Sequence, residues 1–255
     1  MPVELYGYRY SVYSWIARLV LEEKGVGYRW IEADPFADDV PKFYLALHPF
    51  KRVPALVHDG FQLYETAAIT RYLDEAFPSP RLQSADPRVR ARSTQIISIV
   101  DSYAYWPLVR QVFSHRVFRP RFGQPWDAAE VQKGLQAAQV VLAALERIVP
   151  DTAYLCDAAL SLADLHLAPM IGYFVMADEG DALLRQQPKL GRWWSTMSRR
   201  AGYRATTPRL PIAGSPGSTE GPIPLTRELV AQLGASEIAP APLTIGASLG
   251  SPITS

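Results

Sequence analysis

The chain has 255 residues, 48% of them hydrophobic and 20% charged, which is enough apolar material for one large domain or two small ones. Its 26 Lys and Arg are balanced by 25 Asp and Glu, for a formal net charge of +1, and this argues against a dedicated nucleic-acid binder. The single cysteine, Cys156, excludes an internal disulfide, a CxxC redox pair and a Cys-based zinc site, and indicates a reducing compartment.

The sequence gives no reason to expect export, membrane insertion or metal binding. The first ten residues include Glu4 and Arg9 and have no apolar core, so they do not resemble a signal peptide. The longest apolar run, Val140–Leu145, is far shorter than the ~20 residues that span a bilayer. The four histidines are never closely paired, so no metal site is expected. The chain is predicted to be cytoplasmic, with no membrane partner.

Residues 1–78 alternate between short strands and amphipathic helices. Apolar spacing after Ser11 predicts a helix that ends at Gly25 or Gly27, and Asp59-Gly60 predicts a hairpin turn. The expected order is β-α-β-α-β-β-α, over residues 3–6, 11–24, 28–31, 42–47, 53–57, 61–64 and 66–77. A β-α-β unit followed by a hairpin predicts an α/β domain with a mixed four-stranded sheet and helices on both faces.

A linker at 79–85 is followed by an all-helical domain, 86–205. Its expected helices are 86–117, 127–148, 161–177 and 188–200, and Pro107 is expected to kink or divide the first. Ser161 and Asp164 form a capping box at the start of the third helix, and Trp193 and Trp194 are interpreted as core.

The last segment, 206–255, differs from the rest in composition. It holds 8 of the 22 prolines and no aromatic residue, so it buries too little apolar surface to offset its ordering entropy. We expect a Pro/Gly-rich tail rather than a third domain.

Three motifs, in order and correctly spaced, carry a resemblance to a known family. They are the stretch Tyr10-Ser11-Val12-Tyr13-Ser14-Trp15 with Arg18 and Glu23-Lys24-Gly25, the stretch from Pro49 to Leu56, and the stretch from Leu63 to Ile69 with Tyr72-Leu73. Over about residues 3–207 the chain resembles the cytosolic glutathione transferases, with serine-type features of the phi and zeta classes. The resemblance implies a thioredoxin-like glutathione-binding domain, followed by an all-α C-terminal helical bundle domain.

The resemblance also suggests how glutathione is held. It implies a cis peptide bond between Val53 and Pro54, so that the N–H and C=O of Val53 can pair with the cysteinyl backbone like an added strand. The alternative is an ordinary trans proline at a strand start. Thr66 lies where a helix begins, and its hydroxyl and the free N–H groups there can bind the γ-glutamyl carboxylate, or Thr66 can act simply as an N-cap.

The charged groups of glutathione need charged partners. Glu65 can pair with the γ-glutamyl ammonium. For the glycine carboxylate the candidates are Lys51 and Arg52, because Asp38 and Asp39 stand near the positions where family members often carry basic residues. The alternative for both cations is a solvated surface charge.

The partner of the sulfur decides the chemistry. The resemblance to the serine-type classes places a hydrogen-bond donor at Ser11, between the first strand and the first helix, where it favours the thiolate. Tyr6 is the alternative, since other classes use a tyrosine near the end of that strand, and Tyr13 and Ser14 are weaker rivals. A purely structural role for Ser11 as a helix N-cap is also open.

The electrophile is expected to bind between the two domains. Aromatic stripes are more often core than ligand contacts, which is the alternative for each candidate wall residue. Cys156, outside the thioredoxin-like half, is interpreted as a small buried hydrophobe. The candidate walls are Tyr8, Tyr10, Tyr103, Trp106, Leu108 and Phe113.

The predicted function is a detoxifying glutathione S-transferase that uses glutathione as co-substrate against a small hydrophobic electrophile. A glutathione-dependent isomerase of the maleylacetoacetate type is an alternative, weakened because Val12 and Tyr13 replace the Ser-Ser-Cys triplet of that class. A non-catalytic binding or dimerisation module is another. We expect a homodimer, with Phe50 as the apolar residue inserted into the partner or, alternatively, folded back onto its own sheet.

Overall fold

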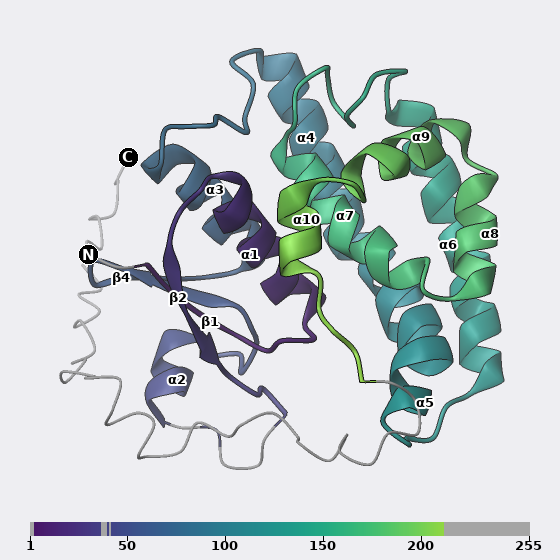
Figure 1. The fold of residues 1–255 in the computed structure, drawn as a ribbon, viewed down its shortest axis with the longest axis horizontal. Coiled ribbons are helices and arrows are strands. Elements are labelled where there is room, and N and C mark those ends of the chain that lie inside the picture. Colours follow the sequence, from purple (N-terminus) through teal and green to yellow (C-terminus); the bar gives the residue numbers. More distant parts are fainter. Residues whose placement is uncertain (1–2, 37–39, 41, 212–255) are drawn as a thin grey trace, which may run out of the picture.

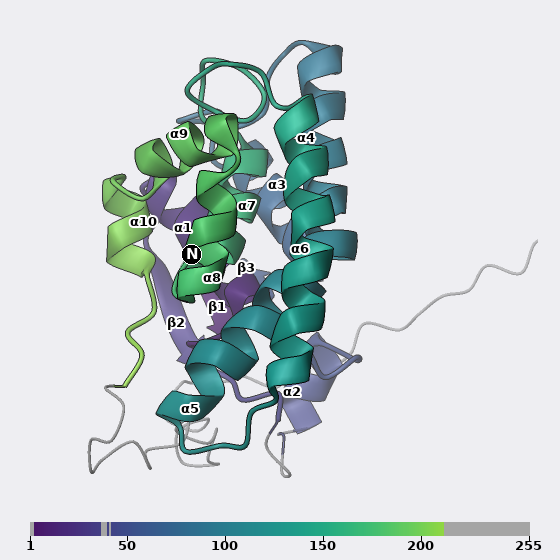
Figure 2. The ribbon, with the colours of Figure 1, turned by 90° about the vertical axis from the view of Figure 1, so that its right-hand side faces the viewer.

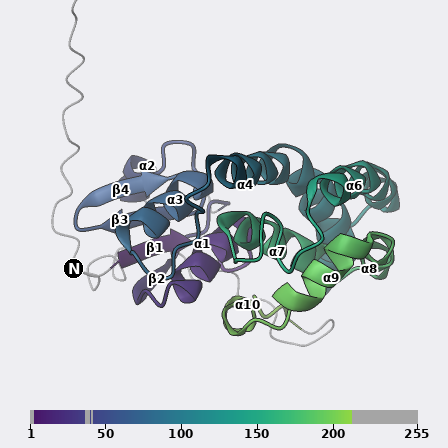
Figure 3. The same cartoon turned by 90° about the horizontal axis from the view of Figure 1, so that it is seen from above.

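The computed structural model describes residues 3–36, 40 and 42–211. The predicted tail lies outside the described residues from 212 onward, as do Asp38 and Asp39. The described part consists of a sheet-containing half, Val3 to Ala76, and a helical half, Pro87 to Thr206 (Figure 1). Seen from above, the two halves lie side by side (Figure 3).

The sheet-containing half has the expected order of elements. They are β1 (Val3–Gly7), α1 (Val12–Glu23), β2 (Tyr28–Glu32), α2 (Lys42–Leu47), β3 (Ala55–His58), β4 (Phe61–Tyr64) and α3 (Thr66–Ala76). The strand order is β2-β1-β3-β4, with β1 and β2 parallel and the other pairs antiparallel. The mixed four-stranded sheet and the thioredoxin-like architecture are therefore confirmed.

The strands alternate between two apolar clusters on opposite faces. Leu5 and Leu56 belong to the large cluster with α1 and α3, whereas Tyr6 and Ala55 belong to a small one with α2. This is the period of two that places neighbouring side chains of a strand on opposite faces. In Figure 1, α2 accordingly lies on one side of the sheet and α1 and α3 on the other.

The hairpin was predicted from local chemistry, and the cis proline from the family resemblance. Asp59 and Gly60 have φ values of 51° and 80°, as a two-residue turn with positive φ at both positions requires. The Val53–Pro54 peptide bond is cis, as expected. Strand β3 starts at Ala55 rather than at the predicted Val53, because a proline has no N–H to donate to the sheet.

The helical half contains more elements than the periodicity predicted. They are α4 (Pro87–Ile99), the π-helix η1 (Val100–Phe118), α5 (Arg119–Arg121), α6 (Ala128–Ile148), α7 (Leu162–Phe174), α8 (Asp178–Arg185), α9 (Pro188–Met197) and α10 (Ala201–Thr206). The predicted helix 161–177 ends early, at Phe174, and α8 and α10 were not expected. Figure 2, in which this half faces the viewer, shows α6 in front and the strands behind it.

The long predicted helix 86–117 is not divided at Pro107. Its hydrogen bonding changes from α to π type at Val100 instead, and η1 continues through the proline. The Pro107 carbonyl lies 3.0 Å from the place that a Cβ on Gly134 of α6 would occupy. The helix therefore packs closely on α6 at a residue that lacks an N–H.

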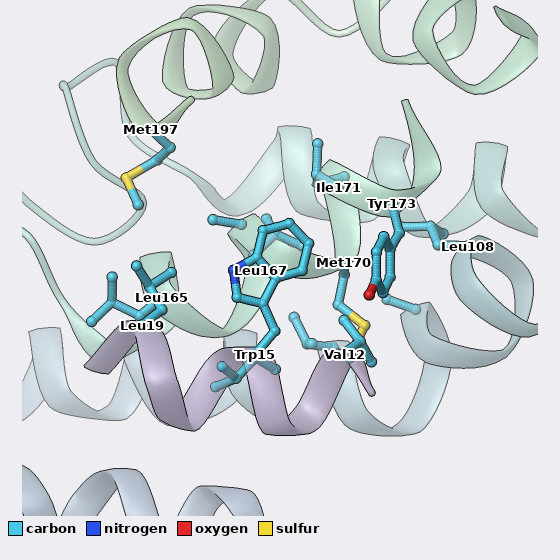
Figure 4. Packing of buried hydrophobic residues seen from close by; sticks show 14 of the residues in the cluster. Val12, Trp15, Leu19, Leu108, Leu165, Leu167, Met170, Ile171, Tyr173 and Met197 are labelled. Atoms are coloured by element: carbon cyan, nitrogen blue, oxygen red, sulfur yellow. The ribbon is translucent and has the colours of Figure 1, made fainter. Parts of the chain in front are cut away.

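The two halves share one core. Trp15 of α1 points into α7, among Leu167, Met170 and Tyr173 (Figure 4). Its indole N–H donates to the Thr206 hydroxyl at 3.0 Å. The halves are therefore packed rigidly enough for a site between them to have a defined shape. No helix in the described ranges is both long and apolar enough to cross a bilayer.

Candidate active site

A cavity of about 1400 Å³ lies between the sheet-containing half and η1. It is lined by the loop after β1, by the segments before β3 and α3, and by one side of η1. The predicted residues that the structure brings together in this lining are Ser11, Lys51, Arg52, Val53, Pro54, Glu65, Thr66, Tyr8, Tyr10, Trp106 and Phe113.

Ser11 is the N-cap of α1. Its Oγ accepts a hydrogen bond from the backbone N–H of Ser14 at 3.3 Å. This bond occupies a lone pair of the hydroxyl, so its proton remains available to a ligand in the cavity. The positive end of the α1 dipole lies at the same place. Ser11 can thus cap the helix and donate to an anion at once.

Tyr6, the alternative, lies on the other face of the sheet. Its hydroxyl donates to Glu4 Oε2 at 3.0 Å, and its ring packs against Phe43 and Tyr44. Burial, first of all, raises the pKa of this phenol, and the Glu4 carboxylate adds to the effect. Within the described lining of the cavity Tyr6 does not occur, so its geometry does not favour a role toward a ligand there.

The backbone of Val53 faces the cavity just before β3. Within the described part of the chain, neither its N–H nor its C=O has a hydrogen-bond partner. The adjacent Arg52 carbonyl, in contrast, accepts from the Tyr44 hydroxyl at 2.6 Å. A donor and an acceptor on one residue are what an extended peptide needs in order to pair like a strand.

The start of α3 presents unsatisfied backbone donors. The structure makes Glu65 the N-cap, with no side-chain capping hydrogen bond, and Thr66 the first helical residue. The reading of Thr66 as the N-cap is therefore wrong. Glu65 has a φ of 71°, a conformation that is costly for a residue with a side chain and is found preferentially at functional sites. The free N–H groups of Thr66 and Ala67 meet the cavity and suit a carboxylate.

Two basic side chains, Lys51 and Arg52, lie at the cavity beside Val53. Lys51 has a φ of 52°, so this turn is held in an uncommon conformation next to the site. The guanidinium of Arg52 has no carboxylate partner within the described residues. Both are therefore placed where a second carboxylate of the ligand can be bound.

Asp101, near the start of η1, was missed by the sequence reasoning. It lines the cavity, and its Oδ1 is buried without a hydrogen-bond partner among the described residues. Burial and, next, the negative charge of Glu65 raise the pKa of Asp101 to about 6. Two carboxylates close to one cavity wall favour a ligand cation between them. The only sequence signal was an acid within an otherwise apolar helical stretch.

His48 is a second residue that was missed. It lines the cavity but is 2% exposed, with its ring 4.9 Å from that of Tyr64, and burial lowers its pKa. Its Nδ1 has no hydrogen-bond partner in the described structure. A neutral imidazole here can serve as a polar contact for a bound molecule.

The wall formed by η1 is aromatic, but two of its predicted members do not belong to it. Tyr10 packs edge-to-face on Phe118 at 5.6 Å, and Phe113 lines the same region. Tyr103 is 66% exposed and Leu108 is fully buried in the core, and neither lines the cavity in the described structure. Tyr105 and Val109 lie there instead. The sequence alone could not tell which side chains of this segment face the cavity, because η1 has wider turns than an α-helix.

Cys156 lies away from the cavity. It is half-buried, packs against the main core cluster, and burial raises the pKa of its thiol to about 11. The thiol is thus neutral at physiological pH, and a thiolate nucleophile is not favoured.

Both halves of the chain match known protein families. Residues 5–81 match the glutathione S-transferase N-terminal domain, and residues 105–201 the glutathione S-transferase C-terminal domain. Glutathione S-transferase F13 of Arabidopsis thaliana is 28% identical over 218 residues, 84% of this chain and 98% of that protein. Maleylacetoacetate isomerase of Rattus norvegicus is 33% identical over 172 residues, 66% of this chain and 76% of that protein. The structure of glutathione S-transferase III in its apo form has a TM-score of 0.73 at 29% identity, with 85% of this chain and 100% of that one covered.

Proposed function

Because the chain belongs to the glutathione S-transferase family, we propose that it binds glutathione in this cavity and transfers it to a small hydrophobic electrophile. The observation that carries the proposal is the meeting of three groups in one cavity. They are the Ser11 hydroxyl, the unpaired backbone of Val53 and the free N–H groups at the start of α3. In this order, they are suited to bind the thiol, the cysteinyl backbone and the γ-glutamyl carboxylate of glutathione.

Each residue then has a chemical role. Val53 pairs with the cysteinyl N–H and C=O, and the first turn of α3 binds the γ-glutamyl carboxylate. Glu65 and Asp101 hold the ammonium, while Arg52, with Lys51, binds the glycine carboxylate. Ser11 donates to the sulfur and stabilises the thiolate, which is the attacking species. The sulfur attacks the electrophilic carbon, a C–S bond forms, and the leaving group departs with its electron pair.

Glutathione-agarose binding, followed by turnover of a neutral aryl chloride, tests this proposal. Binding with turnover is expected. Binding without turnover of any electrophile favours the non-catalytic module, and failure to bind contradicts the proposed site altogether.

The identity to rat maleylacetoacetate isomerase favours one second candidate, a glutathione-dependent cis–trans isomerase. An isomerase releases glutathione after each turnover, whereas a transferase consumes one glutathione per product. Measuring free thiol during turnover of maleylacetoacetate therefore separates the two. Val12 and Tyr13 stand where the isomerase class has its Ser-Ser-Cys triplet. For this reason the transferase remains the first proposal.

Asp101→Asn is expected to raise the KM for glutathione about 10-fold at neutral pH, because it removes one of the two carboxylates that hold the ammonium. In the wild type, protons compete with the ammonium for Asp101. Since its free pKa is raised to about 6, affinity for glutathione should fall as the pH drops through 6. Titration of glutathione binding between pH 5 and pH 8 measures both effects.

The control for this prediction is Asp86→Asn, an exposed helix N-cap at which Asn caps as well as Asp does. It should leave both the affinity and its pH dependence unchanged. If the pH dependence of glutathione affinity is the same in Asp101→Asn as in the wild type, another group is responsible for it.

The protein is expected to be a homodimer in the cytoplasm. Phe50 makes T-shaped contacts with His48 and Tyr64 but is 66% exposed, so most of its ring is free to enter a partner subunit. Phe50→Ser should shift sedimentation at micromolar concentration toward monomer, whereas Trp126→Ser, at another exposed aromatic residue, should not. A monomeric wild type contradicts the dimer, and a dimer indifferent to Phe50→Ser contradicts only the role of Phe50.

A further inference from the structure

Two arginines line the part of the cavity formed by η1 and α5. Arg119 is held in place by two hydrogen bonds: its Nε donates to Ser114 Oγ at 3.4 Å, and its Nη1 donates to the Pro125 carbonyl at 3.0 Å. A guanidinium has five N–H donors, so most of them remain for a ligand. Arg110 lies with its guanidinium 5.9 Å from the centre of the Trp106 ring. Both side chains are therefore oriented without being neutralised.

Neither arginine is paired with a carboxylate in the described part of the chain. Arg116 of η1, which is outside the cavity lining, forms an ion pair with Glu179 at 3.0 Å. Among the described residues, the carboxylates that line the cavity are Asp34, Glu65 and Asp101, of which the last two are assigned to the ammonium of glutathione above. The cavity thus contains two guanidinium groups, those of Arg110 and Arg119, that the proposed glutathione site does not use.

The cavity lining next to these arginines is aromatic. Phe113 and Phe118 lie between them along η1 and line the same cavity, and Phe118 packs against Tyr10 at 5.6 Å. Tyr10 adjoins Ser11, the proposed donor to the sulfur. Aromatic faces bind aryl rings, and a guanidinium beside them binds a carboxylate in plane. A ligand with both features suits this part of the cavity, which Ser11 and both arginines line.

We propose that the electrophile of this enzyme is an aryl compound carrying a carboxylate, which Arg119 binds with the support of Arg110. This inference rests on the proposed transferase function and deepens it. With an aryl chloride, the thiolate sulfur attacks the ring carbon that carries chlorine. The C–S bond forms, the C–Cl bond breaks, chloride leaves with the electron pair, and the proton of the thiol goes to solvent. The arginines touch only the carboxylate.

The test compares a chlorodinitrobenzoate with its neutral carboxamide, both with the chlorine para to the carbonyl group. Arg119→Gln should raise the KM for the benzoate about 10-fold, corresponding to about 1.4 kcal/mol, and change the KM for the carboxamide less than about 2-fold. Arg110→Gln should act in the same direction and more weakly, because Arg110 is exposed. Arg119→Lys keeps the positive charge and should reverse part of the increase in the KM for the benzoate. Added salt should raise the KM for the benzoate and leave the KM for the carboxamide unchanged.

The matched control is Arg116→Gln, which removes a guanidinium one turn away that does not line the cavity. It should leave both substrates unaffected. An equal effect of Arg119→Gln on the benzoate and the carboxamide would overturn the inference, because the arginine would then act through packing rather than charge.

A binding measurement separates this inference from the proposed function. The dinitrobenzoate without chlorine cannot react, so its dissociation constant can be compared with that of its carboxamide by calorimetry. Tighter binding of the benzoate, lost in Arg119→Gln, supports the arginine site even if no substrate is turned over. Turnover of the neutral aryl chloride together with equal binding of both compounds confirms a transferase and overturns the carboxylate preference.

Discussion

Ser11→Ala is expected to lower kcat/KM for conjugation by at least about 10-fold, or about 1.4 kcal/mol of transition-state stabilisation. The hydroxyl acts on the sulfur and not on the peptide, so affinity for glutathione should change little. If donor and helix dipole together lower the thiol pKa by about 2 units, the stabilisation is about 2.7 kcal/mol. The thiolate absorbance of bound glutathione, followed against pH, should shift to higher pH in the variant.

Two controls distinguish the donor from the helix cap. Because Ser11 Oγ also accepts from the Ser14 N–H, alanine costs about 1 kcal/mol of stability as well. Ser11→Thr keeps a hydroxyl for both tasks and should retain most of the activity. Tyr6→Phe removes the other hydroxyl, which lies on the far face of the sheet, and should leave turnover unchanged. If Ser11→Ala turns over normally and Tyr6→Phe does not, the assignment is reversed.

Asp164→Ala is expected to destabilise the protein by about 3–5 kcal/mol, since it leaves several buried donors without their carboxylate acceptor. Asp164 is fully buried. It accepts from the Ser161 N–H and hydroxyl at 2.8 and 2.6 Å, from the Leu155 N–H at 2.8 Å and from the Trp193 indole at 2.8 Å. One side chain thus joins the start of α7 to the preceding loop and to α9.

Urea unfolding of Asp164→Ala beside Asp127→Ala measures this effect. Asp127 is also a helix N-cap, of α6, but it is exposed, and among the described residues its carboxylate accepts only from the Ala129 N–H at 2.8 Å, so its loss should cost about 1 kcal/mol. Equal shifts of the two midpoints would mean that the Asp164 network adds nothing beyond an ordinary cap.

Short sequence patterns were enough to predict the parts of this protein that depend on neighbouring residues. The Asp59-Gly60 turn needs positive φ at two adjacent positions, and this pair supplies it. The capping box of Ser161 and Asp164 is likewise defined within four consecutive residues, and the structure contains it. The site motifs around Ser11 and Val53 were found in the same way, from short stretches whose spacing matched a family.

The residues of the helical half that face the cavity could not be predicted from such short patterns. Along η1, the lining residues Asp101, Tyr105, Val109, Phe113 and Phe118 recur every four or five positions. A helix whose hydrogen bonds span five residues has wider turns than the 3.6-residue period from which faces are predicted. The wider turn places Val109 and Arg110 in the wall and Leu108 in the core. Asp101, at the start of η1, and Glu65 line the same cavity although they lie far apart in the sequence. A pattern of neighbouring residues cannot predict that these two carboxylates share a site.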